Sequence, residues 1–226
     1  MHFELQNVSI HFDAIPALSA LSVQIPTGSM LMVTGPTGSG KTTLLRLLYA
    51  DIFPSEGAVF ISGQRTTTLG RRRIQQLRRR MGICFQDVRL LDDLSVFDNI
   101  FLALLLRNVP APQARSRTLD VLVRLGISYI REKFPAECSM GERHLVGIAR
   151  TLAAKPECII ADEPTGNLDV DTTAMVAEEL RKENERGTTI IVATHDPFFA
   201  AHFPATHRIA LYEGRLVSSD MLTASA

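Results

Sequence analysis

The chain has 226 residues, of which 46% are hydrophobic and 21% are charged, and these are ordinary values for a globular protein. They exclude a disordered chain, a collagen and a coiled coil, and the length is enough for one large domain. The 24 Lys and Arg residues balance the 24 Asp and Glu residues, so the formal net charge is zero. A neutral chain is a poor candidate for wrapping nucleic acid by bulk charge.

Cysteines and apolar segments bear on where the protein works. Cys84, Cys138 and Cys158 are too few and too scattered for a disulfide framework, so we expect them to be reduced. The N-terminus lacks the basic and apolar regions of a signal peptide. The longest strongly apolar segment, residues 100–106, is far too short to span a bilayer. These features predict a soluble, cytoplasmic protein that would reach a membrane only through a partner.

The first part of the chain mixes strand and helix patterns. Alternating or continuous apolar residues predict strands at residues 3–10, 21–25, 30–34, 57–62 and 81–85, and helical spacing predicts a helix at residues 42–50. From residue 92 to residue 155 the apolar spacing is helical, around residues 96–106 and again around residues 118–125. We expect Pro110 and Pro112 to separate these two helices.

The last part returns to the strand–helix–strand pattern. Apolar runs predict buried strands at residues 157–161 and 188–193, joined by a crossover helix at residues 171–186, and a hairpin follows at residues 209–217. This alternation predicts an α/β fold. We expect a single domain over residues 1–226, with a core at about residues 1–90 and 156–226 and an inserted helical subdomain at about residues 91–155.

A phosphate-binding loop follows the third predicted strand. Residues 35–42, Gly-Pro-Thr-Gly-Ser-Gly-Lys-Thr, match G-x-x-x-x-G-K-[ST] in full, between a buried strand and a helix. Glycines let backbone N–H groups surround phosphate oxygens, Lys41 reaches the β- and γ-phosphates, and the Thr42 hydroxyl is a ligand for Mg²⁺. The alternative is a glycine-rich turn, which the correct flanks disfavour. The predicted nucleotide contacts are Gly35, Pro36, Thr37, Gly38, Ser39, Gly40, Lys41, Thr42 and Thr43.

Two acids end the strand at residues 157–161. Strand ends of a parallel sheet form the ligand crevice, so Asp162 is predicted to hold the metal and Glu163 to act as general base toward water. A solvated turn is the alternative for an isolated Asp-Glu pair.

Together these motifs resemble those of ATP-binding-cassette ATPases over nearly the whole chain. Six motifs occur in the order of that family, and the further residues that carry the resemblance are Phe12, Gln86, Ser139-Met140-Gly141-Glu142, Gly147-Ile148-Ala149-Arg150, Asp162 to Asp169 and Ala193-Thr194-His195-Asp196. The resemblance implies a P-loop NTPase core with a mainly parallel sheet, an N-terminal antiparallel β portion and an inserted α-helical subdomain. It also implies ATP and Mg²⁺ as ligands and ATP hydrolysis as the activity.

The resemblance implies roles for the catalytic, metal-binding, adenine-binding and dimer-contact residues. Lys41, Glu163 and His195 would be catalytic, and Thr42, Gln86 and Asp162 would hold the metal. Phe12 would stack on adenine, although alone it is more often a core aromatic, and His195 alone could be a surface histidine. Two chains would pair head to tail, with the signature residues Ser139, Met140, Gly141 and Glu142 facing the partner's ATP and the D-loop residue Asp169 coupling the two sites.

The signature segment departs from the family pattern. Cys138 replaces a leucine and Met140 replaces the first glycine. A side chain at position 140 is expected to crowd the γ-phosphate or to forbid a backbone with positive φ. We therefore expect hydrolysis that is weak or dependent on a partner, with a pure ATP-gated switch as the alternative.

Residues 85–91 and 94–100 resemble the FtsE branch of cell-division ATPases. Asp87 and Arg89 are the distinguishing pair. The resemblance implies a peripheral subunit on the cytoplasmic face of the bacterial inner membrane. An FtsX-like integral membrane subunit would dock at residues 87–105, and the pair would activate peptidoglycan hydrolases. The alternatives are the ATPase of a lipoprotein-releasing or macrolide-type exporter and, in another class, a soluble ATP-dependent clamp; no nucleic-acid partner is expected.

Six arginines fall within ten residues, at residues 71–73 and 78–80. We expect them to form a solvated helix face, with anionic headgroups or nucleic acid as alternative contacts. His202 and His207 are expected to be surface residues without a metal.

Overall fold

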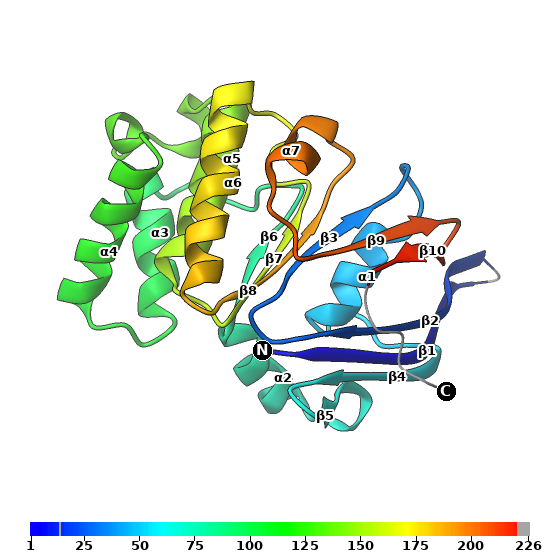
Figure 1. The fold of residues 1–226 in the computed structure, drawn as a ribbon. Coiled ribbons are helices and arrows are strands. Elements are labelled where there is room, and N and C mark those ends of the chain that lie inside the picture. The colour runs from blue at the N-terminus through cyan, green and yellow to red at the C-terminus, as the bar shows by residue number, and fades with distance from the viewer. Residues whose placement is uncertain (14, 221–226) are drawn as a thin grey trace.

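The computed structural model describes residues 1–13 and 15–220, and two sheets organise it (Figure 1). The smaller sheet is antiparallel, with strand order β2-β1-β4-β5. Its strands are β1 (Phe3–Phe12), β2 (Ile15–Ile25), β4 (Glu56–Ile61) and β5 (Gln64–Arg65). The antiparallel portion predicted for the N-terminal part is therefore confirmed.

The larger sheet has six strands in the order β10-β9-β3-β8-β7-β6. They are β3 (Met30–Thr34), β6 (Met81–Cys84), β7 (Cys158–Asp162), β8 (Thr189–Ala193), β9 (His207–Tyr212) and β10 (Arg215–Ser219). All neighbouring pairs are parallel except β9 and β10, which form the predicted hairpin. The sheet is thus mainly parallel, as expected for an α/β fold.

Successive residues of the central strands enter two different cores. On β3, Leu31 and Val33 pack between the two sheets with α1 (Lys41–Leu48), whereas Met30 and Met32 pack against the helices on the other face. Side chains of a strand alternate between its two faces, and both faces of this sheet are covered. This is why β3, β7 and β8 are apolar at almost every position.

The remaining helices lie on the other side of the sheet or at its margins (Figure 1). They are α2 (Arg71–Arg79), α3 (Val96–Leu105), α4 (Ala111–Arg124), α5 (Met140–Ala153), α6 (Val170–Glu185) and α7 (Pro197–His202), with short 3₁₀ turns at Thr66–Thr68, Ser128–Ile130 and Pro135–Glu137. In Figure 1, α3, α4 and α5 gather at the end of the sheet that carries β6. The division into a core and a helical subdomain stays our proposal for this arrangement.

Two expected boundaries were wrong. β2 begins at residue 15 rather than residue 21, because the irregular pairing with β1 continues to the end of that hairpin. α4 begins at Ala111, so Pro112 lies in its first turn and only Pro110 precedes the helix. The first turn tolerates proline because its N–H groups have no partner within the helix.

The arginine-rich segment forms α2, but its arginines are not equivalent. Arg71, Arg72 and Arg79 are exposed, as expected of a solvated face. Arg78 instead donates hydrogen bonds to the backbone carbonyls of Tyr49 and Ala50.

Cys84, Cys138 and Cys158 are reduced and buried, as predicted. Within residues 1–13 and 15–220, no helix combines the length and apolarity needed to cross a membrane.

Candidate functional site

Sheet topology brings the predicted site residues to one edge. β3, β8, β7 and β6 are parallel neighbours, so their carboxyl ends lie side by side. The glycine-rich loop follows β3, Asp162 ends β7 and Glu163 follows it, His195 follows β8 and Gln86 follows β6. Four segments far apart in the sequence therefore converge where ligands bind in open α/β sheets.

The glycine-rich loop, residues 35–40, needs its glycines for a close approach. Gly35 has φ 145°, and a Cβ there would lie 2.2 Å from the Leu211 carbonyl oxygen. Gly40 has φ 101° and a Cβ there would lie 2.8 Å from the Ala17 carbonyl oxygen. Side chains at these two positions would collide with backbone, while residues 36–38 remain exposed to solvent. The loop is thus anchored on its protein side and open on its other side.

The side chain of Lys41 forms hydrogen bonds to the backbone of this loop. Its buried Nζ donates hydrogen bonds to the carbonyl oxygens of Gly35 at 2.8 Å and Pro36 at 3.1 Å. An ammonium has three donors, so one remains beyond these two carbonyls. The lysine therefore adds a full positive charge to this loop, next to the N–H groups at the start of α1, where phosphate groups are favoured.

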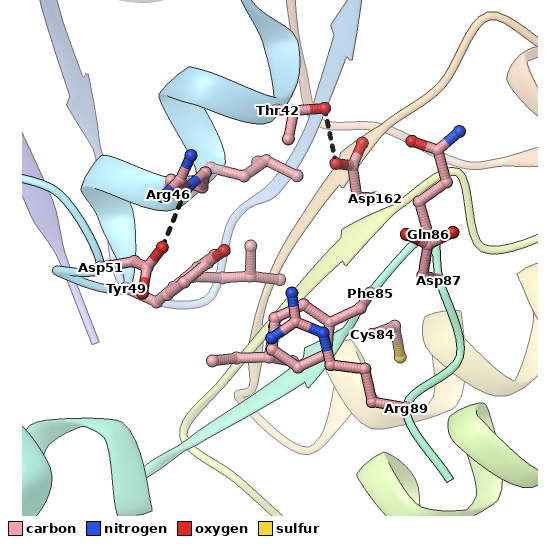
Figure 2. Close-up of a pocket in the computed structure, with 13 residues that line it drawn as sticks. Thr42, Arg46, Tyr49, Asp51, Cys84, Phe85, Gln86, Asp87, Arg89 and Asp162 are labelled. Atoms are coloured by element: carbon pink, nitrogen blue, oxygen red, sulfur yellow. Dashed lines mark hydrogen bonds and ion pairs between the residues drawn. The ribbon is translucent and has the colours of Figure 1, made fainter.

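Thr42 and Asp162 form the oxygen-rich part of the site. The Thr42 hydroxyl donates a hydrogen bond of 2.7 Å to Oδ2 of Asp162, and Figure 2 shows the Gln86 amide beside this pair. Burial raises the pKa of Asp162, and the Glu163 charge adds to this effect, while Thr42 and Lys41 oppose it. The three side chains line an open cavity of about 320 Å³ together with Tyr49 and Arg89.

This donor set suits Mg²⁺. Mg²⁺ prefers hard oxygen ligands and is held by one or two carboxylates together with substrate phosphates and water, not by a cage of side chains. Asp162 supplies one carboxylate, Thr42 a hydroxyl and Gln86 an amide oxygen. Among the residues that the structure describes, no cluster of three or more His, Cys, Asp or Glu side chains forms a complete metal site. The residues therefore fit a metal that arrives with phosphate.

Glu163 and His195 make a direct pair. The Glu163 Oε1 atom lies 2.6 Å from Nδ1 of His195, and Oε2 accepts hydrogen bonds from the Thr194 hydroxyl and the His195 N–H. Glu163 has φ 47°, an uncommon value for a non-glycine residue. This left-handed conformation separates its carboxylate from that of Asp162 and turns it toward the end of β8.

The sequence analysis did not predict Thr194 as a site residue. Its hydroxyl holds Oε2 of Glu163, and the only signal in the sequence is its place directly before His195.

The signature residues lie at the start of α5. Ser139 is the N-cap: its hydroxyl accepts from the Glu142 N–H at 3.2 Å, and the Glu142 carboxylate accepts from the Ser139 N–H at 2.6 Å. Met140 is the first helical residue and is 51% exposed. Met140 is not among the residues with positive φ, so the expected backbone conflict was wrong. An α-helical first turn accepts any side chain, which then points into solvent.

Three further predicted features lie on elements other than the loop: the signature segment, Asp169 and Phe12. Within residues 1–13 and 15–220, no hydrogen bond joins the signature segment to the glycine-rich loop. Asp169 is the N-cap of α6 and accepts from the Thr172 N–H at 2.8 Å. Phe12 ends β1 and is 46% exposed, so it is not a core aromatic. One chain therefore brings together the loop, the metal-type oxygens and the Glu163–His195 pair, but not the signature.

Comparison with known proteins identifies the class. The ABC transporter family matches residues 18–166, more than half of the chain, and the chain belongs to this family of ATP-binding ATPases. A solved dimeric ATP-binding cassette in a post-hydrolysis state, bound to ADP and Pi, superposes with a TM-score of 0.89 at 30% identity and covers 99% of this chain and 100% of that one.

Two curated relatives are equally identical to this chain, so identity does not distinguish the cell-division branch from the lipoprotein-releasing branch. The cell division ATP-binding protein FtsE of Bacillus subtilis is 38% identical over 184 residues, which cover 81% of this chain and 81% of that protein. The lipoprotein-releasing system ATP-binding protein LolD of Bordetella pertussis is 38% identical over 204 residues, which cover 89% of this chain and 87% of that protein. The chain is thus an ABC ATPase similar to both.

Proposed function

We propose that this chain is the ATPase subunit of a membrane complex on the cytoplasmic face of the bacterial inner membrane, and that it acts with an FtsX-like subunit in cell division. The observation that carries the ATPase part is the Glu163–His195 pair next to the loop around Lys41. The cell-division part rests on the similarity to FtsE and on the residues after β6.

The chemistry assigned to the site is hydrolysis of the γ-phosphate. Lys41 and the loop N–H groups hold the phosphates and stabilise their negative charge. A water oxygen attacks the γ-phosphorus, the bond to the β–γ bridging oxygen breaks, and a Glu163 carboxylate oxygen accepts the proton of the water. His195 orients that carboxylate through Oε1, and Thr194 holds Oε2. The products are ADP and phosphate.

We propose Thr42, Asp162 and Gln86 as the residues that hold Mg²⁺. When bound, the metal would neutralise charge on the phosphates. Its presence would also relieve the cost of an ionised, buried Asp162, because a nearby cation favours the charged form of a carboxylate.

A head-to-tail homodimer on ATP binding is part of this proposal. Ser139 and Met140 are exposed at the start of α5, and their position leaves the N-terminal end of that helix free to face a partner's nucleotide. Such an end attracts phosphate oxygens through its N–H groups and dipole. Asp169 would act at the same interface, and Phe12 would stack on adenine.

The choice of branch rests on Asp87 and Arg89. We favour FtsE-like cell division because the run Phe85-Gln86-Asp87-Val88-Arg89-Leu90-Leu91 resembles that branch. Lipoprotein release is the second candidate, supported by the LolD similarity, which covers 89% of the chain against 81% for the Bacillus subtilis FtsE.

The test uses Glu163→Gln as bait. Removing the base should lower hydrolysis by about 10²- to 10⁴-fold and leave ATP binding intact, so the protein should remain in its ATP-bound assembly. The variant is purified with Mg-ATP from detergent-solubilised membranes of its source, and co-purifying proteins are identified by mass spectrometry. Lys41→Ala, which should not bind ATP, is the matched control.

Each outcome has a distinct meaning. Capture of an FtsX-like protein and hydrolase regulators supports cell division, whereas a lipoprotein-releasing subunit supports the second candidate. Capture of no membrane protein would refute the membrane function. Full hydrolysis by Glu163→Gln would refute the assignment of the base.

A further inference from the structure

Positive charge is concentrated in one segment of this neutral chain. Residues 57–86 contain seven arginines and no Asp or Glu, and five of these arginines lie in α2. The seven are Arg65, Arg71, Arg72, Arg73, Arg78, Arg79 and Arg80. Because the formal net charge of the whole chain is zero, the remaining residues carry an equal excess of negative charge.

Three of these arginines are engaged within the chain. Arg73 donates hydrogen bonds to two glutamine side chains, and Arg78 donates to two backbone carbonyls. Arg80 donates to both carboxylate oxygens of Glu157, each at 2.6 Å. These three have contacts that explain their presence in the folded chain.

The other arginines of α2 form an exposed face. The side chains of Arg71, Arg72 and Arg79 are exposed, and within residues 1–13 and 15–220 they make no hydrogen bond or ion pair. They lie on one side of the helix together with two glutamines, whereas Ile74 and Leu77 pack into the core. We call these three residues the arginine face. In Figure 1, α2 lies at the lower margin of the molecule, where a surface can approach it.

The charges of the arginine face do little for the stability of α2. Arg71 and Arg72 are in its first turn, where the positive end of the helix disfavours cations, and that turn contains no acid. Only Arg79, in the last turn, is at the end where a cation is favourable. Repulsion between like charges on one face adds to the cost. A partner that supplies negative charge would remove it.

We propose that the arginine face binds anionic phospholipid headgroups at the membrane surface. The proposal rests on the membrane function proposed above, which places the chain at the cytoplasmic leaflet, where anionic lipids make the surface negative. Guanidinium groups form strong paired hydrogen bonds with phosphate oxygens. A face without apolar side chains suits a charged membrane surface better than a protein interface, whose centre is apolar. The net negative charge of the rest of the chain disfavours a long polyanion such as nucleic acid.

The test measures binding of the purified full chain to protein-free vesicles by sedimentation. One set of vesicles contains equal parts of phosphatidylglycerol and phosphatidylcholine, and the reference set contains phosphatidylcholine alone. The chain should bind the anionic vesicles about tenfold more tightly or better. High salt should abolish this difference, because it screens charges between exposed groups.

Substitutions on the arginine face give the size of the effect. Arg71→Gln, Arg72→Gln and Arg79→Gln should each weaken binding about fivefold, and the triple variant on the order of 100-fold, because each basic residue near an anionic surface adds a similar increment. Arg72→Lys keeps the charge and should bind like the unmodified chain. Arg131→Gln removes the same charge from an exposed position between α4 and α5 and should bind normally. The glutamine variants on the arginine face should keep their Tm and their ATPase activity without vesicles, because the replaced side chains have no partner to lose.

Several outcomes would overturn the proposal. Equal binding to both kinds of vesicle would do so, as would binding of the triple variant equal to that of the unmodified chain. If the chain binds a short DNA duplex more tightly than anionic vesicles, and the triple variant loses that binding, the occupant is nucleic acid. If only membranes that still contain their proteins distinguish the chain from the triple variant, the occupant is an acidic protein. The test vesicles contain no membrane protein, so their result leaves the membrane function to the separate capture experiment with Glu163→Gln.

Discussion

Two adjacent acids, Asp162 and Glu163, enter different environments within one step of the chain. Asp162 ends β7 inside the sheet and bonds to Thr42, whereas the left-handed φ of Glu163 turns its carboxylate to His195. Burial raises the pKa of Asp162, so its ionised form is costly when no cation is bound. The ionised, buried Asp162 therefore lowers the stability of the chain when no cation is bound, but its carboxylate is in place to bind one.

Asp162→Asn tests this effect on stability. The pKa of Asp162 is higher in the folded chain than in the unfolded chain, so the ionised carboxylate destabilises the wild-type chain at neutral pH. This destabilisation disappears as the pH falls below the ordinary pKa of Asp, because the carboxylate is then protonated in both states. We expect the variant to be more stable at pH 7 by on the order of 1 kcal/mol, about 2–4 °C in Tm for this size. Mg²⁺-dependent ATPase activity should fall sharply. Thermal melts at pH 7 and at about pH 4 measure the difference, which should shrink at the lower pH.

The control for this variant is Asp93→Asn, at an exposed position. It should change neither Tm nor activity. A destabilised Asp162→Asn at pH 7 would mean that the hydrogen bond from Thr42 outweighs the desolvation of the carboxylate.

At the scale of elements, an ion network joins α4 to α6. Arg124 of α4 pairs with Glu179 and Glu183 of α6, and their side chains are only 6% and 3% exposed. Lys182 and Arg186 pair with the same two acids from the solvent side. The network therefore ties a helix of the proposed helical subdomain to a helix beside the parallel sheet.

Arg124→Ala should be costly because it leaves two buried carboxylates with fewer partners. We expect a loss of about 2–4 kcal/mol in the free energy of unfolding, measured by urea denaturation. Arg181→Ala is the matched control: Arg181 pairs with Glu178 on the exposed side of α6, where such pairs contribute about 1 kcal/mol or less. Equal losses in the two variants would contradict the structural role given to the buried network.

At the scale of the whole molecule, the two segments that we propose as halves of an ATP site lie on different elements of the described chain. The loop, Asp162 and Glu163 are on the carboxyl edge of the sheet, and the exposed Ser139 and Met140 begin α5. Helix α5 is already capped by its own Ser139 and Glu142, so the chain folds without a nucleotide there. A second copy is the partner that would bring a signature to each loop.

Met140→Glu separates dimer formation from folding. Position 140 is 51% exposed in the first turn of α5, where a negative charge is favourable for the helix, so the monomer should keep its Tm. The same charge would face the γ-phosphate of a partner. In the Glu163→Gln background, size-exclusion chromatography with Mg-ATP should show a dimer that Met140→Glu abolishes.

Val123→Glu adds the same charge at a 69% exposed position of α4 and should leave the dimer intact. A persistent dimer in Met140→Glu would contradict the predicted head-to-tail contact.

Local sequence patterns were sufficient for the fold class, and they named residues that the structure places at neighbouring strand ends. Short apolar runs rich in β-branched residues and followed by turn residues favour buried strands of a parallel sheet, and a glycine-rich loop between strand and helix permits few structures. Boundaries were less predictable: pairing with β1 extended β2 to residue 15, and the first turn of α4 accommodates Pro112 because its N–H groups have no partner within the helix. These depend on contacts that no single segment contains.

Sequence by itself determined that this chain has a glycine-rich loop between a strand and a helix, a pair of acids at a strand end and a histidine after a later strand. Only the tertiary structure decided how they act together, because the order of strands β3, β8 and β7 sets which strand ends become neighbours. It also decided that Met140 has helical backbone and that Arg107 and Arg150 bond to the backbone carbonyls of Met81 and Arg89. Backbone conformation and charge pairing depend on residues distant in sequence, and folding alone brings these together.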